Sequence, residues 1–323
     1  MDEDGLIAAF ILDGKGGGTP VDWAGVGGVV PDDGLLWVHL DRNNDQAREW
    51  IATSSGLDPL IADALLAKET RPRSFSTSTG LFVILRGINL NKGAQPHDMV
   101  SLRLWVEGHR VISVRNRRIL AIADIADHLA EGRGPQTAGA FLAHIAQSLT
   151  DRMEPAIQEM VDGIDRLEET VDQIKHARSR KRLTALRHKA IVLRRYLAPQ
   201  REALGRISTD SLAWLSINEK MAIREITDRT TRYVEELDEM RERCAILQDE
   251  VFHALSMQMN QRVYVLTVLA ALIVPLTLVS GLLGMNVGGM PLAENKHGFW
   301  WVLGGLTIVP LVAGLILKKL KWL

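Results

Sequence analysis

Residues 263–283 read VYVLTVLAALIVPLTLVSGLL, a stretch of 21 residues without a charged side chain. A second uncharged run, of 19 residues, extends from Phe299 to Leu317. As α-helices these runs would be roughly 31 and 28 Å long, close to the ~30 Å hydrocarbon thickness of a bilayer. Buried core helices of a soluble protein are the alternative, but uncharged runs of this length are unusual there. The sequence therefore predicts two C-terminal transmembrane helices.

The charges beside these runs predict their orientation. Arg262 precedes the first run, and Lys318, Lys319 and Lys321 follow the second. Because basic residues flank membrane helices on the cytoplasmic side, we expect both termini in the cytoplasm and only the loop 285–298 outside. The acidic start of the chain, MDED, begins no apolar signal segment, so the large N-terminal part is expected to stay inside. These features predict a multi-pass protein of the inner membrane.

Composition excludes several classes of protein. The chain has 323 residues, a net charge of −1 and a single cysteine, Cys244. A nucleic-acid binder needs a positive excess, and a disulfide framework or cysteine-based zinc fold needs more cysteines. The glycine-rich stretch Gly14–Thr19 lacks the spacing of a phosphate-binding loop and is expected to be a flexible surface loop. With no nucleotide motif and no spaced nucleophile and base, we expect neither an enzyme nor a covalently bound cofactor.

The part before the membrane runs predicts a mixed fold. The expected strands are Leu6–Leu12, Leu35–Leu40, Leu81–Ile88, Val100–Val106 and Arg110–Arg115, and the expected short helices are Asp45–Thr53 and Pro59–Leu66. From Gln136 onward the pattern is helical, with a basic stretch (Arg166–Arg206) and an acidic one (Glu219–Glu250) expected to pack side by side.

The predicted fold class is an α+β membrane protein with an N-terminal α/β cytoplasmic domain, a long helical stalk or funnel and two transmembrane helices. Its expected parts are an α/β domain (1–135), helical arms (136–207), a stalk helix (208–262), a first transmembrane helix (263–284), a periplasmic loop (285–298), a second transmembrane helix (299–317) and a basic tail (318–323).

One long helix has two different faces. No strong helix breaker occurs between about Asp210 and Pro275, so the helix is expected to reach Gly284. An apolar seam on a seven-residue repeat consists of Leu237, Met240, Cys244, Leu247, Val251 and Leu255. The other side, called the polar stripe below, consists of Asp249, His253, Ser256, Asn260, Thr267 and Thr277, with Val263, Ala270, Val274, Gly281 and Gly284 between them.

A polar stripe through an apolar segment predicts contact with water. Two helices cannot enclose an aqueous path, so a pore requires several copies of the chain around an axis. Threonines that bond back to their own backbone are the alternative interpretation. Pro275 lacks an amide hydrogen and leaves the carbonyl of Ala271 without its helical partner, so we expect this oxygen to serve a passing hydrated cation.

The end of the first run, Pro275-Leu276-Thr277-x-x-x-Gly281-x-x-Gly284-Met285-Asn286, resembles the CorA-type divalent metal transporters. Residues 284–300 and the segment Leu36–Asp41 are similar to the ZntB-type zinc-transporter branch of that family. The resemblance implies a homopentamer with a cytoplasmic funnel and a pore lined by the first membrane helix.

By position, the resemblance also implies site residues. The selectivity ring would be Gly284, Met285 and Asn286, and the pore-lining residues would be Thr277, Val274, Thr267, Asn260, His253 and Asp249. Val274 and Val263 stand where magnesium transporters of the family often have methionines. This departure from the family pattern affects the expected hydrophobic gate and not the expected pathway.

The chemistry of these residues suits a divalent cation. Asn286 amide oxygens can accept hydrogen bonds from the water shell of a metal ion. Such a ring does not separate zinc from magnesium, whereas imidazole suits zinc. The expected metal-contacting residues are Asn286, Glu294, His297, Asp249 and His253, ordinary exposed side chains being the alternative for both histidines.

The sequence thus predicts zinc uptake through a homo-oligomer. A divalent ion moving inward gains roughly 4.6 kcal/mol per 100 mV of inside-negative potential. Proton coupling, which the zinc branch suggests, would use groups at the pore mouths, since neither span contains an ionisable residue of the Asp, Glu, Lys, Arg or His type. The alternatives are transport of magnesium, cobalt or nickel, zinc efflux, or a membrane-anchored sensor or scaffold. The expected partners are copies of the chain, divalent cations and the bilayer, with no nucleic acid or nucleotide.

Overall fold

The computed structural model describes residues 4–27, 34–169, 177–285, 287 and 295–319. The chain divides into two compact units, Met1–Gln248 and Asp249–Leu323. Asn286 and Glu294, two of the predicted metal-contacting residues, lie outside the described residues.

The first unit is built on a mixed β-sheet. Its seven described strands are β1 (Leu6–Leu12), β2 (Gly18–Pro20), β3 (Leu35–Asp41), β4 (Arg73–Ser76), β5 (Leu81–Gly87), β6 (Val100–Val106) and β7 (Arg110–Arg115), in the order β2-β1-β3-β7-β6-β5-β4. β3 and β7 pair in parallel, and the other neighbours are antiparallel. All five expected strands are confirmed, whereas the short strands β2 and β4 were not predicted.

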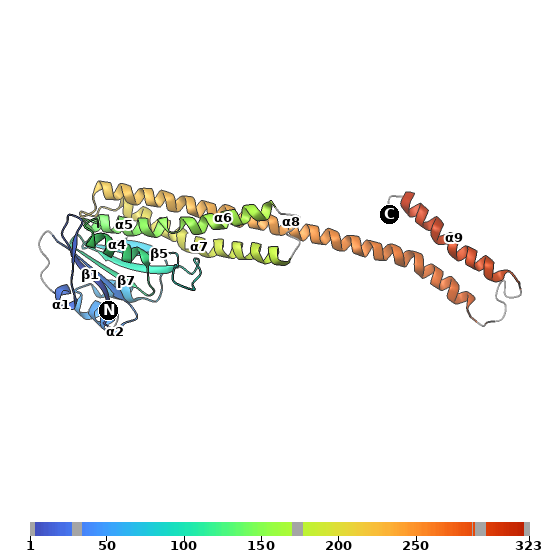
Figure 1. Ribbon diagram of the computed structural model, residues 1–323, viewed down its shortest axis with the longest axis horizontal. Coiled ribbons are helices and arrows are strands. Elements are labelled where there is room, and N and C mark those ends of the chain that lie inside the picture. Colours follow the sequence, from blue (N-terminus) through green and yellow to red (C-terminus); the bar gives the residue numbers. More distant parts are fainter. Residues whose placement is uncertain (1–3, 28–33, 170–176, 286, 288–294, 320–323) are drawn as a thin grey trace. The chain divides into compact units, whose positions relative to one another are not determined.

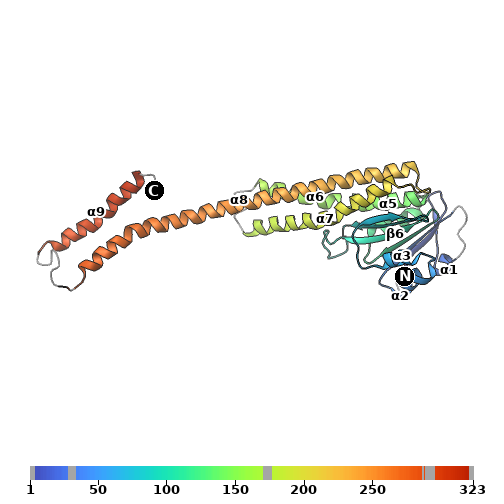
Figure 2. The same ribbon diagram turned by 180° about the vertical axis from the view of Figure 1, so that it is seen from behind.

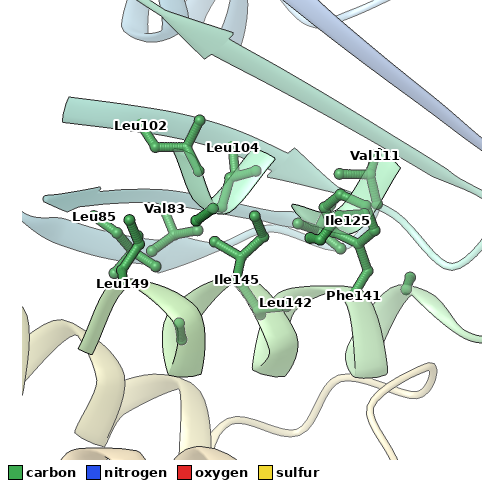
Figure 3. Close-up of a cluster of buried hydrophobic side chains, with 14 of the residues drawn as sticks. Val83, Leu85, Leu102, Leu104, Val111, Ile125, Phe141, Leu142, Ile145 and Leu149 are labelled. Carbon is green, nitrogen blue, oxygen red and sulfur yellow. The ribbon is translucent and has the colours of Figure 1, made fainter. Parts of the chain in front are cut away.

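Helices cover both faces of this sheet, because apolar side chains of successive strand residues point to opposite faces. One face packs against α4 (Leu120–Ala130) and α5 (Ala138–Asp151), and Figure 3 shows Phe141, Leu142, Ile145 and Leu149 of α5 pointing at the strands. The other face packs against α1 (Trp23–Val26), α2 (Asp45–Glu49), the π-helical turn η1 (Trp50–Ser54) and α3 (Pro59–Leu66). The α/β domain predicted from the sequence is therefore present, although α4 was not predicted.

The glycine-rich stretch forms a surface turn that side-chain and backbone hydrogen bonds hold together. The Asp13 carboxylate accepts hydrogen bonds from the backbone N–H groups of Lys15 (2.7 Å) and Gly17 (2.9 Å). Gly16 has a φ of +106°, a conformation that favours glycine, and its carbonyl accepts the N–H of Gly134 at 2.7 Å. The glycines thus permit a tight turn that a neighbouring loop fixes in place.

Three long helices follow, α6 (Glu154–Glu168), α7 (Ala177–Thr209) and α8 (Ile217–Leu283). In the first unit, α6, α7 and the first part of α8 lie side by side (Figures 1 and 2). α8 begins later than expected, because Ser216 and Glu219 form a capping box at its start. The backbone N–H of Ser216 donates to the Glu219 carboxylate (2.6 Å), and that of Glu219 donates to the Ser216 hydroxyl (3.3 Å).

Ion pairs join these helices. The Arg194–Asp238 pair confirms the predicted packing of the basic stretch against the acidic one, whereas the Arg243 pairs have the opposite polarity. Arg194 of α7 contacts Asp238 of α8 at 2.5 Å. Arg243 of α8 contacts both Asp165 and Glu168 of α6 at 2.5 Å. Because all these groups are partly exposed, each pair contributes at most about 1 kcal/mol.

The apolar seam of α8 supplies the rest of the packing. Leu237, Met240, Cys244 and Leu247 are at most 4 % exposed. Burial raises the pKa of the Cys244 thiol, which keeps it in the neutral form. The burial of Cys244 confirms its predicted place in the apolar seam.

The second unit contains the end of α8 and a further helix, α9 (Gly298–Lys319). Both helices are long and apolar enough to cross a membrane, and they are the two such helices among the described residues. Their large apolar side chains are mostly exposed, for example Leu266 (66 %) and Trp301 (70 %). A lipid bilayer or other copies of the chain would cover such surfaces.

Candidate ion pathway

The polar stripe lies on an open face of α8. Asp249, His253, Asn260, Thr267, Val274 and Thr277 are all exposed in the structure. Since each helical residue turns the chain by about 100°, these positions fall within one sector of the helix surface. The helix is continuous through this region, so the stripe extends without interruption from Asp249 towards Gly284.

The apolar partner of α8 lies on nearly the opposite side. A cleft of about 430 Å³ separates α8 from α9. On α8 its lining includes Leu272, Leu276, Val279 and Leu283. At about 100° per residue, the mean direction of these four residues is close to opposite that of the stripe. The second membrane helix therefore leaves the stripe uncovered within one chain.

Pro275 and Ala271 border the cleft, and the expected role of the Ala271 carbonyl stays a prediction. Both residues line the cleft beside α9. At about 100° per residue, Ala271 has the same direction as His253 of the stripe, so it lies at the edge that the cleft and the stripe share. The Ala271 oxygen therefore remains a predicted contact of the hydrated cation.

The stripe threonines make the backbone bonds that the alternative interpretation expected. The hydroxyl of Thr267 donates to the carbonyl of Val263, and that of Thr277 donates to the carbonyl of Ile273, each at 2.9 Å. These bonds use the hydroxyl hydrogens, whereas the oxygen lone pairs point outward as acceptors. A water molecule in the shell of a cation can donate to such an oxygen, so the backbone bonds orient the hydroxyls without removing their function.

The predicted groups at the inner end of the stripe are unpaired in the described structure. Asp249 and His253 are four residues apart on α8, and neither side chain has a hydrogen bond or an ion pair among the described residues. The His253 ring lies 6.2 Å from the ring of Phe252. Positions four apart share one face of a helix, so a carboxylate and an imidazole are available together.

The predicted groups at the outer end occupy the two helix ends. The N–H of Gly284 donates to the carbonyl of Ser280 at 3.0 Å, just beyond the last residue of α8. His297 precedes α9, where its carbonyl accepts the N–H groups of Trp300 (3.1 Å) and Trp301 (3.2 Å). Its imidazole is exposed, as is the side chain of Met285.

No three side chains of the His, Cys, Asp or Glu type come together to hold a metal ion among the described residues. His253 and Asp249 lie at one end of the apolar segment of α8, and His297 follows its other end in sequence. The structure of one chain therefore does not unite the predicted metal-contacting residues that it describes.

The sequence analysis placed no site in the first unit, yet basic side chains gather there around a pocket. Arg42, Arg86 and Arg103 line it. The available signal was Arg103, an arginine in the middle of the apolar strand Val100–Val106.

An α/β unit, a long helix and two helices that are long and apolar enough to cross a membrane form the architecture of a membrane protein with a large domain outside the bilayer. Residues 32–319 match the family model described as "CorA-like Mg2+ transporter protein". The chain belongs to this family, and its function is divalent cation transport of the CorA and ZntB type. This finding favours transport over the sensor or scaffold interpretation.

Two relatives match the chain over its whole length. The divalent cation transporter CmaX of Pseudomonas aeruginosa is 38 % identical over 326 residues, covering 100 % of this chain and 98 % of the relative. The zinc transport protein ZntB of Pectobacterium carotovorum is 36 % identical over 325 residues, with the same coverage. The resemblance to the CorA family and its ZntB-type branch is thus confirmed.

Solved structures show the same architecture. The full-length CmaX structure superimposes with a TM-score of 0.84 at 37 % identity, covering 100 % of this chain and 99 % of that one. The complete CorA magnesium transporter of Methanocaldococcus jannaschii has a TM-score of 0.80 at 17 % identity and covers 98 % and 99 % of the two chains. The second likeness concerns the fold alone. The predicted fold class, with a long helix and two C-terminal apolar helices, is confirmed.

Proposed function

We propose that this protein carries zinc into the cytoplasm through a central pore of a homopentamer in the inner membrane, with both termini inside. The observation that carries the proposal is the opposition of the two faces of α8. The apolar cleft beside α9 lies on one side, and the polar stripe lies on nearly the other side. Several copies arranged with their stripes towards one axis would enclose water and leave α9 towards lipid.

Each level of the stripe has a separate role in this proposal. At the outer end, the ring of Gly284, Met285 and Asn286 accepts a hydrated ion through its amide oxygens. Thr277 and Thr267 offer hydroxyl oxygens along the span, with Val274 between them. Asn260, His253 and Asp249 line the inner end, where five copies of the carboxylate would attract a cation.

Zinc is favoured over other divalent cations by two observations. ZntB relatives are named zinc transport proteins and match the chain from end to end. His253 and His297 are exposed near the two ends of the first span, and imidazole binds zinc but is a poor ligand for magnesium. Magnesium, cobalt or nickel is the second candidate cargo, favoured by the description of the family model.

The test is ion flux into liposomes that contain the purified protein and a zinc-sensitive dye. We expect the Asn286→Ala variant to lose flux, because the ring would lack its hydrogen-bond acceptors. Asn218→Ala is the matched control, since Asn218 is an exposed asparagine at the start of α8 in the first unit. Normal flux in Asn286→Ala would exclude the assigned ring, and equal loss in both variants would exclude a role specific to it.

The cargo is tested by competition in the same liposomes. If zinc is the cargo, zinc flux should persist in millimolar magnesium, and His253→Gln and His297→Gln should reduce it. Loss of zinc flux in magnesium would favour the magnesium alternative instead. If the protein exports zinc instead, the dye signal should appear only when zinc is supplied on the cytoplasmic side of the protein.

A further inference from the structure

A basic pocket opens at one end of the sheet in the first unit, far along the sequence from the ion pathway. Its volume is about 360 Å³. The sheet, helix α7 and the segment that follows α3 form its walls. The basic residues that line it are Arg42, Lys68, Arg86, Arg103, Arg117 and Arg195. Asp98 is the one carboxylate among the described lining residues. None of these seven side chains forms an ion pair in the described part of the chain.

Arg103 is the central group of this pocket. It stands in the middle of β6 and is 1 % exposed. Its Nη2 donates to the carbonyl of Ala67 at 2.9 Å, whereas its Nε and Nη1 have no partner among the described residues. A buried guanidinium with two unused donor nitrogens is costly unless something accepts from it.

Two further arginines have the same kind of environment. Arg42 Nε donates to the carbonyl of Leu66 at 2.8 Å, and Arg86 donates to the carbonyls of Thr70 and Met99, each at 2.9 Å. Backbone carbonyls fix the positions of these side chains, but being neutral they do not balance the charge. Three guanidinium groups are thus held near one another without a paired carboxylate.

The unbalanced positive charge lowers the pKa values of two of these arginines. Burial, together with the neighbouring positive charges of Arg42 and Arg86, lowers the pKa of Arg103 to about 10. The pKa of Arg86 is lowered too, mainly by burial and also by the positive charge of Arg195. An anion in the pocket would raise the pKa of both arginines, because it would supply the missing opposite charge.

The geometry fits a particular ligand chemistry. A guanidinium presents parallel N–H groups that match two oxygens of one phosphate, which makes arginine the preferred residue for such anions. Arg86 is also fixed in orientation, since its guanidinium lies 3.9 Å from the centre of the Tyr196 ring of α7. The volume greatly exceeds the ~10–15 Å³ that one water needs, so a phosphate group and its waters have room.

We propose that this pocket binds a multiply charged oxyanion of the phosphate class, with Arg103 as its central ligand and Arg42 and Arg86 beside it. Because α7 contributes Arg195 and Tyr196 while the sheet contributes Arg86 and Arg103, the bound anion connects that helix to the sheet. The site is separate from cation transport and does not depend on the identity of the metal.

The test is isothermal titration calorimetry of the full-length protein in detergent, in phosphate-free buffer at constant ionic strength. Inorganic phosphate, pyrophosphate and ADP are titrated separately. We expect saturable binding that weakens as sodium chloride is raised. Binding of inorganic phosphate identifies a single phosphate group as sufficient, and tighter binding of pyrophosphate or ADP identifies a diphosphate.

The variants separate the pocket from overall charge. Arg103→Met should weaken binding at least about tenfold, since a hydrogen-bonded charge pair is lost. Arg195→Gln, at the exposed rim of the pocket, should weaken binding by a few-fold. This variant tests the proposal if Arg103→Met does not fold. Arg224→Gln, on the exposed surface of α8, removes the same charge and should leave binding unchanged.

Three results would overturn the proposal. The first is no saturable binding of any of the three anions to the unaltered protein, as would follow if an acidic side chain of a neighbouring copy filled the pocket. The second is unchanged affinity in both Arg103→Met and Arg195→Gln. The third is an equal loss of affinity in Arg224→Gln, which would indicate nonspecific attraction to net charge.

Discussion

At the scale of single residues, buried polar groups of the first unit are as informative as the exposed stripe. His39 on β3 is 0 % exposed, and its Nδ1 lies 2.8 Å from the hydroxyl of Ser113. The indole N–H of Trp37 donates to the same hydroxyl at 2.9 Å. Burial, together with the positive charge of Arg115, lowers the pKa of His39 to about 3. The imidazole is therefore neutral in the folded protein.

This histidine predicts a loss of stability in acid. The unfolded chain protonates His39 near pH 6.5 and the folded chain near pH 3, so the unfolded state binds more protons between these values. Stability from this group is fully present above about pH 6.5 and decreases as the pH falls towards 3. Between pH 7 and 5 we expect a loss of roughly 1–2 kcal/mol, measured by thermal unfolding of the full-length protein.

The pH dependence of suitable variants tests this assignment. His39→Gln should unfold at a lower temperature at pH 7 but lose less stability between pH 7 and 5. His188→Gln is the control, since His188 is exposed on α7, and it should keep the original pH dependence. An unchanged pH dependence in His39→Gln would show that other groups cause the acid sensitivity.

At the scale of the element, α8 combines two kinds of helix. Before Asp249 its seam is buried against the other helices of the first unit, and from Asp249 onward most of its surface is exposed. A helix that is apolar on one side and polar on the other predicts two different environments for those sides. In the second unit these sides are the cleft lined with α9 and the polar stripe.

Thiol labelling of single cysteines distinguishes the two sides. In a Cys244→Ala background, Asn260→Cys, Thr267→Cys and Thr277→Cys should react with a water-soluble thiol reagent in membranes. Leu272→Cys, Leu276→Cys and Val279→Cys are the matched controls on the cleft side and should react much more slowly. Comparable labelling on both sides, or none on the stripe, would contradict an aqueous path along α8.

A second element-scale prediction concerns the junction between α6 and α8. Arg243 is 24 % exposed, and its guanidinium donates to Glu168 through Nε (2.8 Å) and Nη2 (2.5 Å). Arg243→Met should lower the unfolding temperature by about 2–4 °C, corresponding to roughly 1 kcal/mol. Arg241→Met removes a more exposed pair within α8 and should have a smaller effect. Equal shifts in both variants would indicate that the bond to α6 adds no stability.

At the scale of the whole molecule, the proposed pore needs several chains. The proposal of a homopentamer predicts a native mass about five times the 35.8 kDa of one chain, apart from bound lipid and detergent. Native mass spectrometry of the purified protein checks this directly. A monomer or dimer that still transports zinc would exclude a pore on a five-fold axis.

The driving force is also a property of the assembly in its membrane. If the potential drives uptake, zinc flux should increase with an inside-negative potential, by up to roughly 4.6 kcal/mol per 100 mV for a divalent ion. If protons are coupled, an inward pH gradient should increase flux at zero potential. Liposomes with imposed potassium and pH gradients separate the two, and flux indifferent to both would exclude each mechanism.

The sequence by itself determined the features that depend on local order along the chain. Five strands, α3 and the two apolar helices follow from periodicity and uncharged length, because neighbouring residues alone set those patterns. The Gly284-Met285-Asn286 ending pointed to the family in the same way. The start of α8 was placed about seven residues early, because the Ser216 and Glu219 cap outweighed the absence of a breaker.

Only the tertiary structure decided which distant residues meet. β2 and β4 are short edge strands whose pairing, not their composition, makes them strands. The basic pocket joins β5, β6, the segment after α3 and α7, which no local pattern brings together. Periodicity fixes which residues share a face, whereas packing fixes what that face meets.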